Sequence, residues 1–343
     1  MRSRLPTLAL VSTLVAASAP AGAAAQESIE VSGRPRAPIS IGNYPNVNGL
    51  RINFRDENLG RVNGMNVTVW TPVEPMSGVV KGIALGLPST GAARIEGLGI
   101  GVFGIGAADR LSGVMRGGLG AGAGGKVSGI AIGGIGVGTG GDLSGIMIGG
   151  VGAGGGGNAS GFLMGGVGAG VGGSFKGVAV GGVGVGAGGN GKGIVLGGVG
   201  AGVGGNFTGV AIGGVGAGAG GTFTGFAIGG VGIGAGESLR GAAIGGVGVG
   251  APRLEGGFLA LVVGAKDARA IVIAPAYFKI ERDGSFRGGA LSAVNYIKGS
   301  QHGLTIGLVN YARSLHGLQV GVLNIIADQR EHPVLPLVNW GAR

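Results

Sequence analysis

Cysteine is absent from this 343-residue sequence, aromatic residues make up only 5% of it, and charged residues 12%. Without cysteine there can be no disulfide, no thiol nucleophile and no thiolate ligand for zinc. Carboxylates are also few, and the closest pairs, Asp56 with Glu57 and Glu281 with Asp283, fall in charged segments that we expect to be turns. A general acid–base pair needs an environment that shifts its pKa. We therefore expect no enzymatic activity, no catalytic residue and no cofactor.

Glycine, in contrast, supplies 89 residues, and hydrophobic residues make up 45% of the chain. Such a glycine excess is typical of repetitive or fibrous proteins. Collagen is excluded, because glycine does not recur at every third residue. An apolar content this high with so little charge also argues against disorder.

The first 25 residues have the pattern of a secretory signal peptide. Arg2 and Arg4 precede an apolar stretch over residues 8–17, and three alanines at 23–25 form a small-residue cleavage site. We therefore expect an exported protein, located at the cell surface, in the outer membrane or in the periplasm.

The sequence contains an internal repeat of sixteen residues. One unit, residues 209–224, reads GVAIGGVGAGAGGTFT, and positions are numbered here from its first glycine. Position 1 is occupied by Gly113, Gly129, Gly145, Gly161, Gly177, Gly193, Gly209, Gly225 and Gly241. Polar residues recur at positions 14 and 16, where the chain is expected to turn, and β-branched residues lie between one such turn and the next. Turn chemistry at this period predicts one coil of a narrow β-solenoid per repeat.

Alternation along a strand predicts which side chains point inward. The apolar residues of positions 2 and 4 are expected inside, with the alanines of position 3 and the glycines of positions 8 and 10 outside. Position 3 includes Ala131, Ala179, Ala211, Ala227 and Ala243. A flat glycine–alanine face would favour self-association or contact with a membrane or envelope surface. By the same pattern, Leu50, Ile52 and Phe54 are expected inside, with Arg51 and Asn53 outside.

The period shortens toward the C-terminus, where Gly289, Gly303 and Gly317 are fourteen residues apart. Four asparagines recur there at fourteen or fifteen residues, namely Asn295, Asn310, Asn324 and Asn339. Stacked in successive coils, they would form a hydrogen-bonded ladder.

The predicted fold is all-β, a glycine-rich β-solenoid of 14–16-residue coils in a single elongated domain. After the signal peptide (1–25), the expected parts are an irregular leader or cap (26–48), N-terminal coils (49–112), the glycine-rich repeats (113–256), and C-terminal coils with the asparagine ladder and a cap (257–343).

Other motifs carry little functional weight. G-x-G-x-x-G recurs in nearly every repeat, whereas a phosphate-binding loop needs one copy between a strand and a helix. His302 and His316 each precede a position 1 glycine and could come close together, but no carboxylate recurs beside them, so no metal site is expected. The net charge of +10 is modest and dispersed, and nucleic acid is not an expected partner.

The phrases at Gly303–Tyr311, Gly317–Asn324 and Val334–Trp340 resemble the G-L-Q-I-G-L-x-N repeats of bacterial surface repeat-containing proteins, including a leptospiral family. The resemblance covers about the last 60 residues, with a weaker match over 49–70, and the glycine-rich middle departs from it. It implies a location at the cell surface or outer membrane and no known activity.

The sequence thus favours a non-enzymatic structural or adhesion protein of the cell envelope. One alternative is an outer-membrane β-barrel pore, whose strands also alternate. A second is a solenoid that binds a ligand of unknown identity on a flat face, although threonines at 139, 208, 222 and 224 are too irregular to form ranks.

Overall fold

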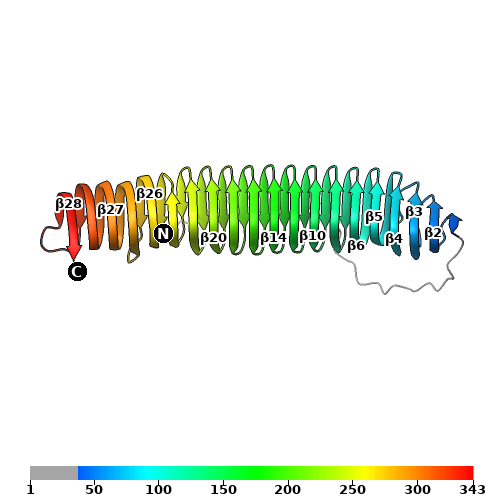
Figure 1. The fold of residues 1–343 in the computed structure, drawn as a ribbon, viewed down its shortest axis with the longest axis horizontal. Coiled ribbons are helices and arrows are strands. Elements are labelled where there is room, and N and C mark those ends of the chain that lie inside the picture. Colours follow the sequence, from blue (N-terminus) through cyan, green and yellow to red (C-terminus); the bar gives the residue numbers. More distant parts are fainter. Residues whose placement is uncertain (1–37, 343) are drawn as a thin grey trace, which may run out of the picture. The chain divides into compact units, whose positions relative to one another are not determined.

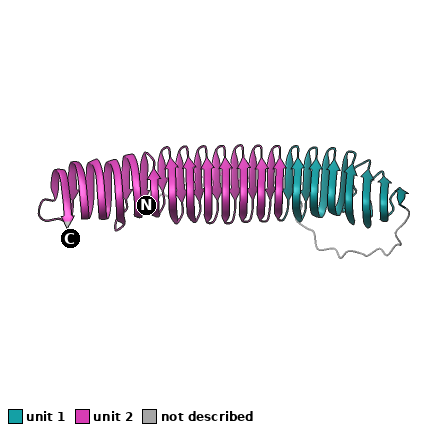
Figure 2. Ribbon diagram, in the orientation of Figure 1, with its two compact units in different colours: residues 1–141 teal, residues 142–343 magenta. Residues whose placement is uncertain are grey.

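A computed structural model describes residues 38–342. The chain divides into two compact units, 1–141 and 142–343 (Figure 2), and each is considered by itself. The signal peptide predicted over 1–25 lies outside the described residues, as does the first half of the segment 26–48; the described half contains β1 and the start of β2. Every regular element between residues 38 and 342 is a β-strand, so that part of the chain contains no helix able to span a membrane.

Each unit is a stack of coils in which the strands form two layers (Figure 1). In unit 1 the first layer contains β1 (Ile39–Ile41), β2 (Asn46–Asn53), β3 (Arg61–Thr68), β4 (Val79–Gly86) and β8 (Lys126–Gly133). The second layer contains β7 (Gly120–Ala123) and β9 (Gly136–Thr139). Two longer strands, β5 (Ser89–Gly101) and β6 (Gly104–Gly117), begin in the second layer and end in the first.

In unit 2 the first layer contains β10 (Leu143–Gly149), β12 (Ala159–Gly165), β14 (Phe175–Gly181), β16 (Gly191–Gly197), β18 (Phe207–Gly213), β20 (Thr222–Gly229), β22 (Ser238–Gly245) and β24 (Arg253–Leu259). The second layer contains β11 (Gly152–Gly155), β13 (Gly168–Val171), β15 (Gly184–Ala187), β17 (Gly200–Val203), β19 (Gly216–Ala219), β21 (Gly232–Ala235), β23 (Gly248–Gly250) and β25 (Val262–Ala265). The chain then continues through β26 (Asp267–Ile280), β27 (Ser285–Ile326) and β28 (Val334–Ala342).

Successive strands of a layer pair in parallel, and equivalent positions of the repeat lie directly opposite one another. Gly193 pairs with Gly209 and Ile194 with Val210, an offset of sixteen residues. Each position therefore forms a row along the stack, which we number as in the repeat. The predicted fold class, an all-β solenoid with coils of about sixteen residues, is confirmed.

The glycines of row 1 have a backbone conformation that other residues rarely adopt. Their φ angles lie between +102° at Gly129 and +146° at Gly317. A Cβ atom on Gly209 would also collide with the carbonyl oxygen of Gly193 in the preceding coil. Where row 1 has this conformation it needs glycine on both grounds; Ala270, which lies between Gly256 and Gly288 in the row, does not have a positive φ. In the C-terminal coils this row contains Gly288, not Gly289 as the fourteen-residue spacing suggested.

The prediction of inward and outward positions is wrong for the first layer. The alanines of row 3, such as Ala211 and Ala227, are buried, whereas rows 2 and 4 point outward and are half-buried or exposed. The reason lies at row 5, where the chain turns so sharply that a Cβ on Gly213 would collide with the carbonyl oxygen of Gly216 in the same coil. In the glycine-rich coils row 5 is therefore glycine, and alternation from it turns row 3 inward and rows 2 and 4 outward. Outside these repeats row 5 also points inward but holds Asn53, Thr68, Ala260, Ala274 and Ser292, all buried.

The same correction applies to the N-terminal coils. Arg51 and Asn53, expected outside, are buried, while Leu50 and Ile52 are only half-buried and Phe54 is 66% exposed.

The interior of unit 2 is thin and is filled by rows 3, 9, 11 and 15. Side-chain sizes compensate along a strand: Gly191 of row 15 accompanies Val195 of row 3, whereas Phe207 accompanies Ala211. Phe207 and Phe223 stack in row 15 with centroids 5.2 Å apart. Because the interior is closely packed, its volume limits how large the side chains of rows 3 and 15 can be in any one strand.

Neighbouring residues Leu163 and Met164 test this orientation. Leu163 is 2% exposed and Met164 is 40% exposed. Leu163→Ala should cost about 2–5 kcal/mol of unfolding free energy because it opens a cavity, whereas Met164→Ala should cost less than about 1 kcal/mol. Urea denaturation followed by far-UV circular dichroism measures both variants. A larger loss for Met164→Ala would show that the strand faces the other way.

Candidate functional surfaces and buried polar clusters

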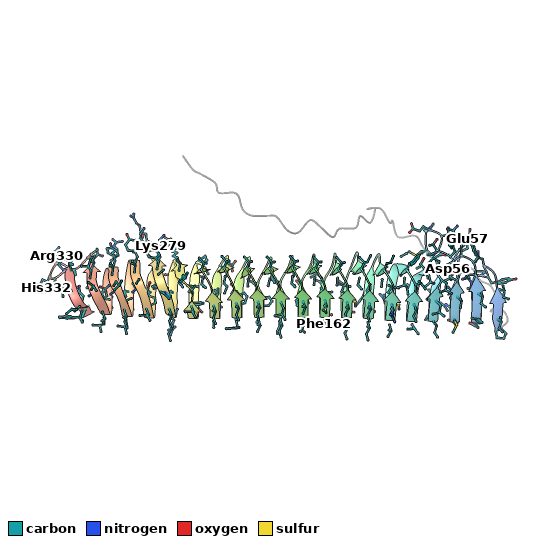
Figure 3. All side chains as sticks on the ribbon, turned by 90° about the horizontal axis from the view of Figure 1, so that it is seen from above. Asp56, Glu57, Phe162, Lys279, Arg330 and His332 are labelled. Atoms are coloured by element: carbon teal, nitrogen blue, oxygen red, sulfur yellow. The ribbon has the colours of Figure 1, made fainter. Side chains whose placement is uncertain are left out.

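The first layer of unit 2 presents an outward apolar face made of rows 2 and 4. Its members in the glycine-rich coils are Ile146, Ile148, Phe162, Met164, Val178, Val180, Ile194, Leu196, Val210, Ile212, Phe226, Ile228 and Ile244. Phe162 projects away from the strands, on the opposite side from Lys279 (Figure 3). Large exposed apolar patches mark contact sites in soluble proteins, so this face is the first candidate functional surface.

Valine forms a further outward row at the corner between the layers. Row 7 runs from Val151 to Val247, and each valine N–H donates to the carbonyl of the valine in the preceding coil, as Val215 does to Val199 at 2.7 Å. These side chains are 42–50% exposed. In the second layer the outward rows 8 and 10 are glycine over most of the repeats, so that layer offers almost no side-chain surface there.

Row 16 borders the apolar face and is polar or basic. In unit 2 it runs in register through Ser144, Ser160, Lys176, Lys192, Thr208, Thr224, Arg240, Glu255, Arg269 and Arg287. Arg240 is paired with Glu255 at 3.3 Å. Among residues 38–342 no ion pair forms at Lys176, Lys192, Arg269 or Arg287, which we call the basic edge. Sequence reasoning missed it because these residues lie sixteen or more apart and look dispersed.

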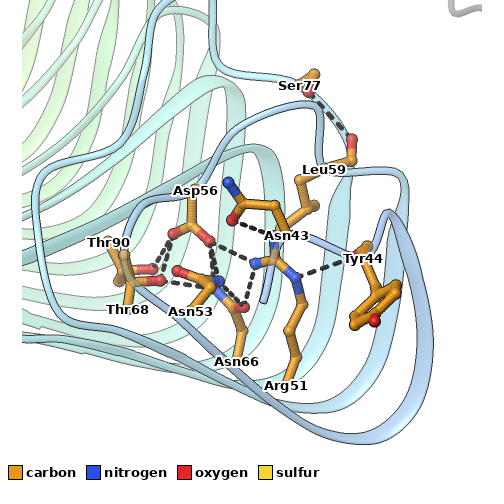
Figure 4. Close-up of polar contacts among 10 residues, drawn as sticks. All are labelled: Asn43, Tyr44, Arg51, Asn53, Asp56, Leu59, Asn66, Thr68, Ser77 and Thr90. Carbon is orange, nitrogen blue, oxygen red and sulfur yellow. Dashed lines mark hydrogen bonds and ion pairs between the residues drawn. The ribbon is translucent and has the colours of Figure 1, made fainter. Parts of the chain in front are cut away.

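A buried polar cluster occupies the interior of the N-terminal coils of unit 1 (Figure 4). The Asp56 carboxylate is 2% exposed and accepts five hydrogen bonds. Thr68 and Thr90 donate to Oδ2 at 2.7 and 3.1 Å, and Asn53 and Asn66 donate to Oδ1 at 3.0 and 2.9 Å. Five donors saturate a carboxylate, so Asp56 has no lone pair left for a substrate or a metal.

The fifth donor to Asp56 is the guanidinium of Arg51. Arg51 Nη1 lies 2.7 Å from Asp56 Oδ1 and 2.7 Å from Asn66 Oδ1, and its Nε donates to the Tyr44 carbonyl. Burial lowers the pKa of Arg51, and the hydrogen bond and charge of Asp56 oppose that shift. The cluster thus neutralises a buried charge, which is a structural role.

Removal of the Asp56 charge should destabilise the N-terminal coils. Asp56→Asn leaves the Arg51 guanidinium buried without a counter-ion and should cost about 3–5 kcal/mol. Glu57→Gln, an exposed neighbour, is the control and should change stability by less than about 0.5 kcal/mol. Urea denaturation followed by Trp70 fluorescence, in a Trp340→Phe background, measures this region. Equal stability of the two variants would rule out the structural role of the pair.

The structure brings three of the four asparagines together inside unit 2. Asn295 donates to Asn310 Oδ1 and Asn310 donates to Asn324 Oδ1, both at 2.7 Å. Their second amide hydrogens reach backbone carbonyls, for example that of Ile306 at 3.1 Å. In row 9 this polar series replaces Val263 and Phe278 of the preceding coils.

Asn339 lies next to this series but differs from it in strand direction and in hydrogen-bond partner. Its strand, β28, runs antiparallel to β27 and places Asn339 opposite Gln319. The Asn339 amide contacts the carbonyl of Asn324 at 3.5 Å instead of a side-chain oxygen. The antiparallel strand covers the edge of β27, and Pro336 interrupts the outer edge of β28, as is typical of protected edge strands.

His302 and His316 lie above one another on the outside of successive coils. Their rings are parallel within 3°, with centroids 4.6 Å apart. Burial lowers the pKa of His302, and the charges of His316 and Arg287 lower it further. Among residues 38–342 no group of three metal-ligating side chains comes together. The two rings form a stacking contact.

The histidine pair predicts a loss of stability in acid. Because the folded state has a lowered pKa at His302, the unfolded state binds more protons between that value and the ordinary one of about 6.5. Its stabilising contribution is thus complete above pH 6.5 and falls as the pH decreases through this window. His302→Gln should reduce the shift in urea midpoint between pH 7.5 and 5, measured by Trp340 fluorescence. His332→Gln, an exposed histidine outside the stack, should leave the shift unchanged.

Comparison with protein-family models, with curated proteins and with solved structures finds no significant match.

Proposed function

We propose that this chain is a non-enzymatic, exported structural or adhesion element of a bacterial envelope that attaches to another surface through the apolar face. The observation that carries the proposal is the outward position of rows 2 and 4, with Ile146, Ile194 and Ile244 each 40–42% exposed. The core is filled without them, so these side chains are available to a partner surface.

Three further features support this role. The Asp56 carboxylate, and the amide groups that link Asn295, Asn310 and Asn324, are hydrogen-bonded to the protein itself, as structural groups are. The secretory pattern of residues 1–25 supports export. The resemblance of the C-terminal coils to bacterial surface repeats supports a location at the cell surface, in the outer membrane or in the periplasm.

Two triple variants with the same chemistry test the proposal. Val178→Thr, Val180→Thr and Val210→Thr alter the apolar face, and Val183→Thr, Val199→Thr and Val215→Thr alter the row 7 corner. The readouts are sedimentation of the purified full chain with isolated envelope fractions and its oligomeric state by analytical ultracentrifugation. The face variant should bind or associate several-fold more weakly than the corner variant, because burial of each lost methyl contributes roughly 0.8 kcal/mol. A wild-type chain that stays monomeric and binds no envelope fraction would contradict the proposal.

A further inference from the structure

The apolar face of unit 2 is bordered on one side by positive charge. Row 16 immediately precedes row 1 in each strand, so its side chains lie on the same outward side as rows 2 and 4. Lys176 and Lys192 are opposite one another in adjacent strands, as are Arg269 and Arg287, and all four are exposed.

The basic edge lacks the acidic partners that Arg240, Lys279 and Arg313 have in unit 2. On the second-layer side, Lys279 pairs with Glu281 at 2.7 Å, and Arg313 pairs with Asp283 and Asp328 at 3.0 and 3.3 Å. The one carboxylate of row 16, Glu255, is occupied by Arg240. The apolar face is thus bordered by four basic residues without an ion pair.

We infer that the apolar face of unit 2 lies on the surface of an anionic phospholipid bilayer, with the basic edge contacting lipid phosphates. This inference rests on the proposed function and names the surface that the face binds. An apolar face bordered by lysine and arginine is the pattern by which interfacial proteins bind anionic membranes. Lysine and arginine can also keep their charges at headgroup level while their methylene chains cover apolar surface.

The C-terminal end of unit 2 adds an aromatic residue to this face. Trp340 of β28 lies opposite Leu318 of row 2 and is 61% exposed. Directly opposed residues share one face of a sheet, so Trp340 extends the apolar face. Tryptophan favours the membrane–water interface, where its ring is buried and its N–H stays hydrated.

A second copy of the chain fits this surface less well. Two apolar faces packed together would have to bury the basic edge of each copy or leave it at the rim. Row 16 offers no free carboxylate to neutralise that charge. A bilayer supplies both the apolar layer and the phosphates.

Vesicle co-sedimentation with the full chain tests the inference. Vesicles of phosphatidylcholine alone are compared with vesicles containing phosphatidylglycerol, at low and at high salt. We expect binding to the anionic vesicles, weakened by salt because charge attraction to a membrane is screened. Lys176→Gln with Lys192→Gln should weaken it roughly tenfold or more, since each basic residue near an anionic surface contributes about a factor of five.

The control is Lys279→Gln with Lys298→Gln, which removes the same charge from the second-layer side and should change binding by less than about twofold. Circular dichroism checks that both variants are folded. Equal binding to neutral and anionic vesicles, or equal loss in both variants, would overturn the role of the basic edge while leaving attachment through the apolar face intact. A chain that binds no vesicle but self-associates would overturn the bilayer inference alone. Failure of both vesicle binding and self-association, with no binding to envelope fractions, would remove the proposed function as well.

Discussion

In the glycine-rich coils the orientation of the strands depends on how closely the backbone approaches itself at row 5. There the first layer turns into the second so tightly that the glycine of row 5 faces the carbonyl of row 8, as Gly213 faces Gly216. That contact excludes a side chain from row 5 of these coils, and alternation then turns row 3 inward. Alanine is common in rows 3 and 9, and larger interior side chains such as Leu163 and Phe207 alternate with small ones. The aliphatic residues of rows 2 and 4 consequently lie outside.

A thin interior limits how much stability burial can contribute in each coil. Hydrogen bonding between coils compensates, because in the glycine-rich repeats each strand pairs in parallel with the equivalent strand of the next coil at an offset of sixteen residues. The turns take part as well: Asn190 accepts the backbone N–H of Asn206 at 2.8 Å, and Asn206 accepts that of Thr222 at 2.7 Å. Where the interior becomes polar, around Asp56 and along Asn295, Asn310 and Asn324, the side chains continue this bonding inside the coil.

The period, the strand content and the need for glycine in row 1 could be predicted from the sequence, because each depends on local chemistry repeated many times. The inward side of the strands could not, since hydrophobicity favours Ile or Val over Ala as a core residue, and in the glycine-rich coils the close backbone approach at row 5 reverses that preference. Arg51 was placed outside for the same reason. Its partner Asp56 comes from a loop whose path no repeat predicts. The reversed direction of β28 likewise follows from chain connectivity rather than from the asparagine spacing that includes Asn339.

The exposed positions of rows 2 and 4 indicate that these side chains have a role other than filling the core. Row 16 has the same outward orientation on the same strands and is filled by serine, threonine and lysine, so the strands form with polar residues there. Threonine has a high strand preference and would serve equally well at Val178 or Val210. The fold therefore does not require apolar side chains in these rows. Their repetition in consecutive coils of unit 2 agrees with the proposed burial against another surface, and the adjoining charge of Lys176 and Lys192 agrees with the proposal that this surface is anionic.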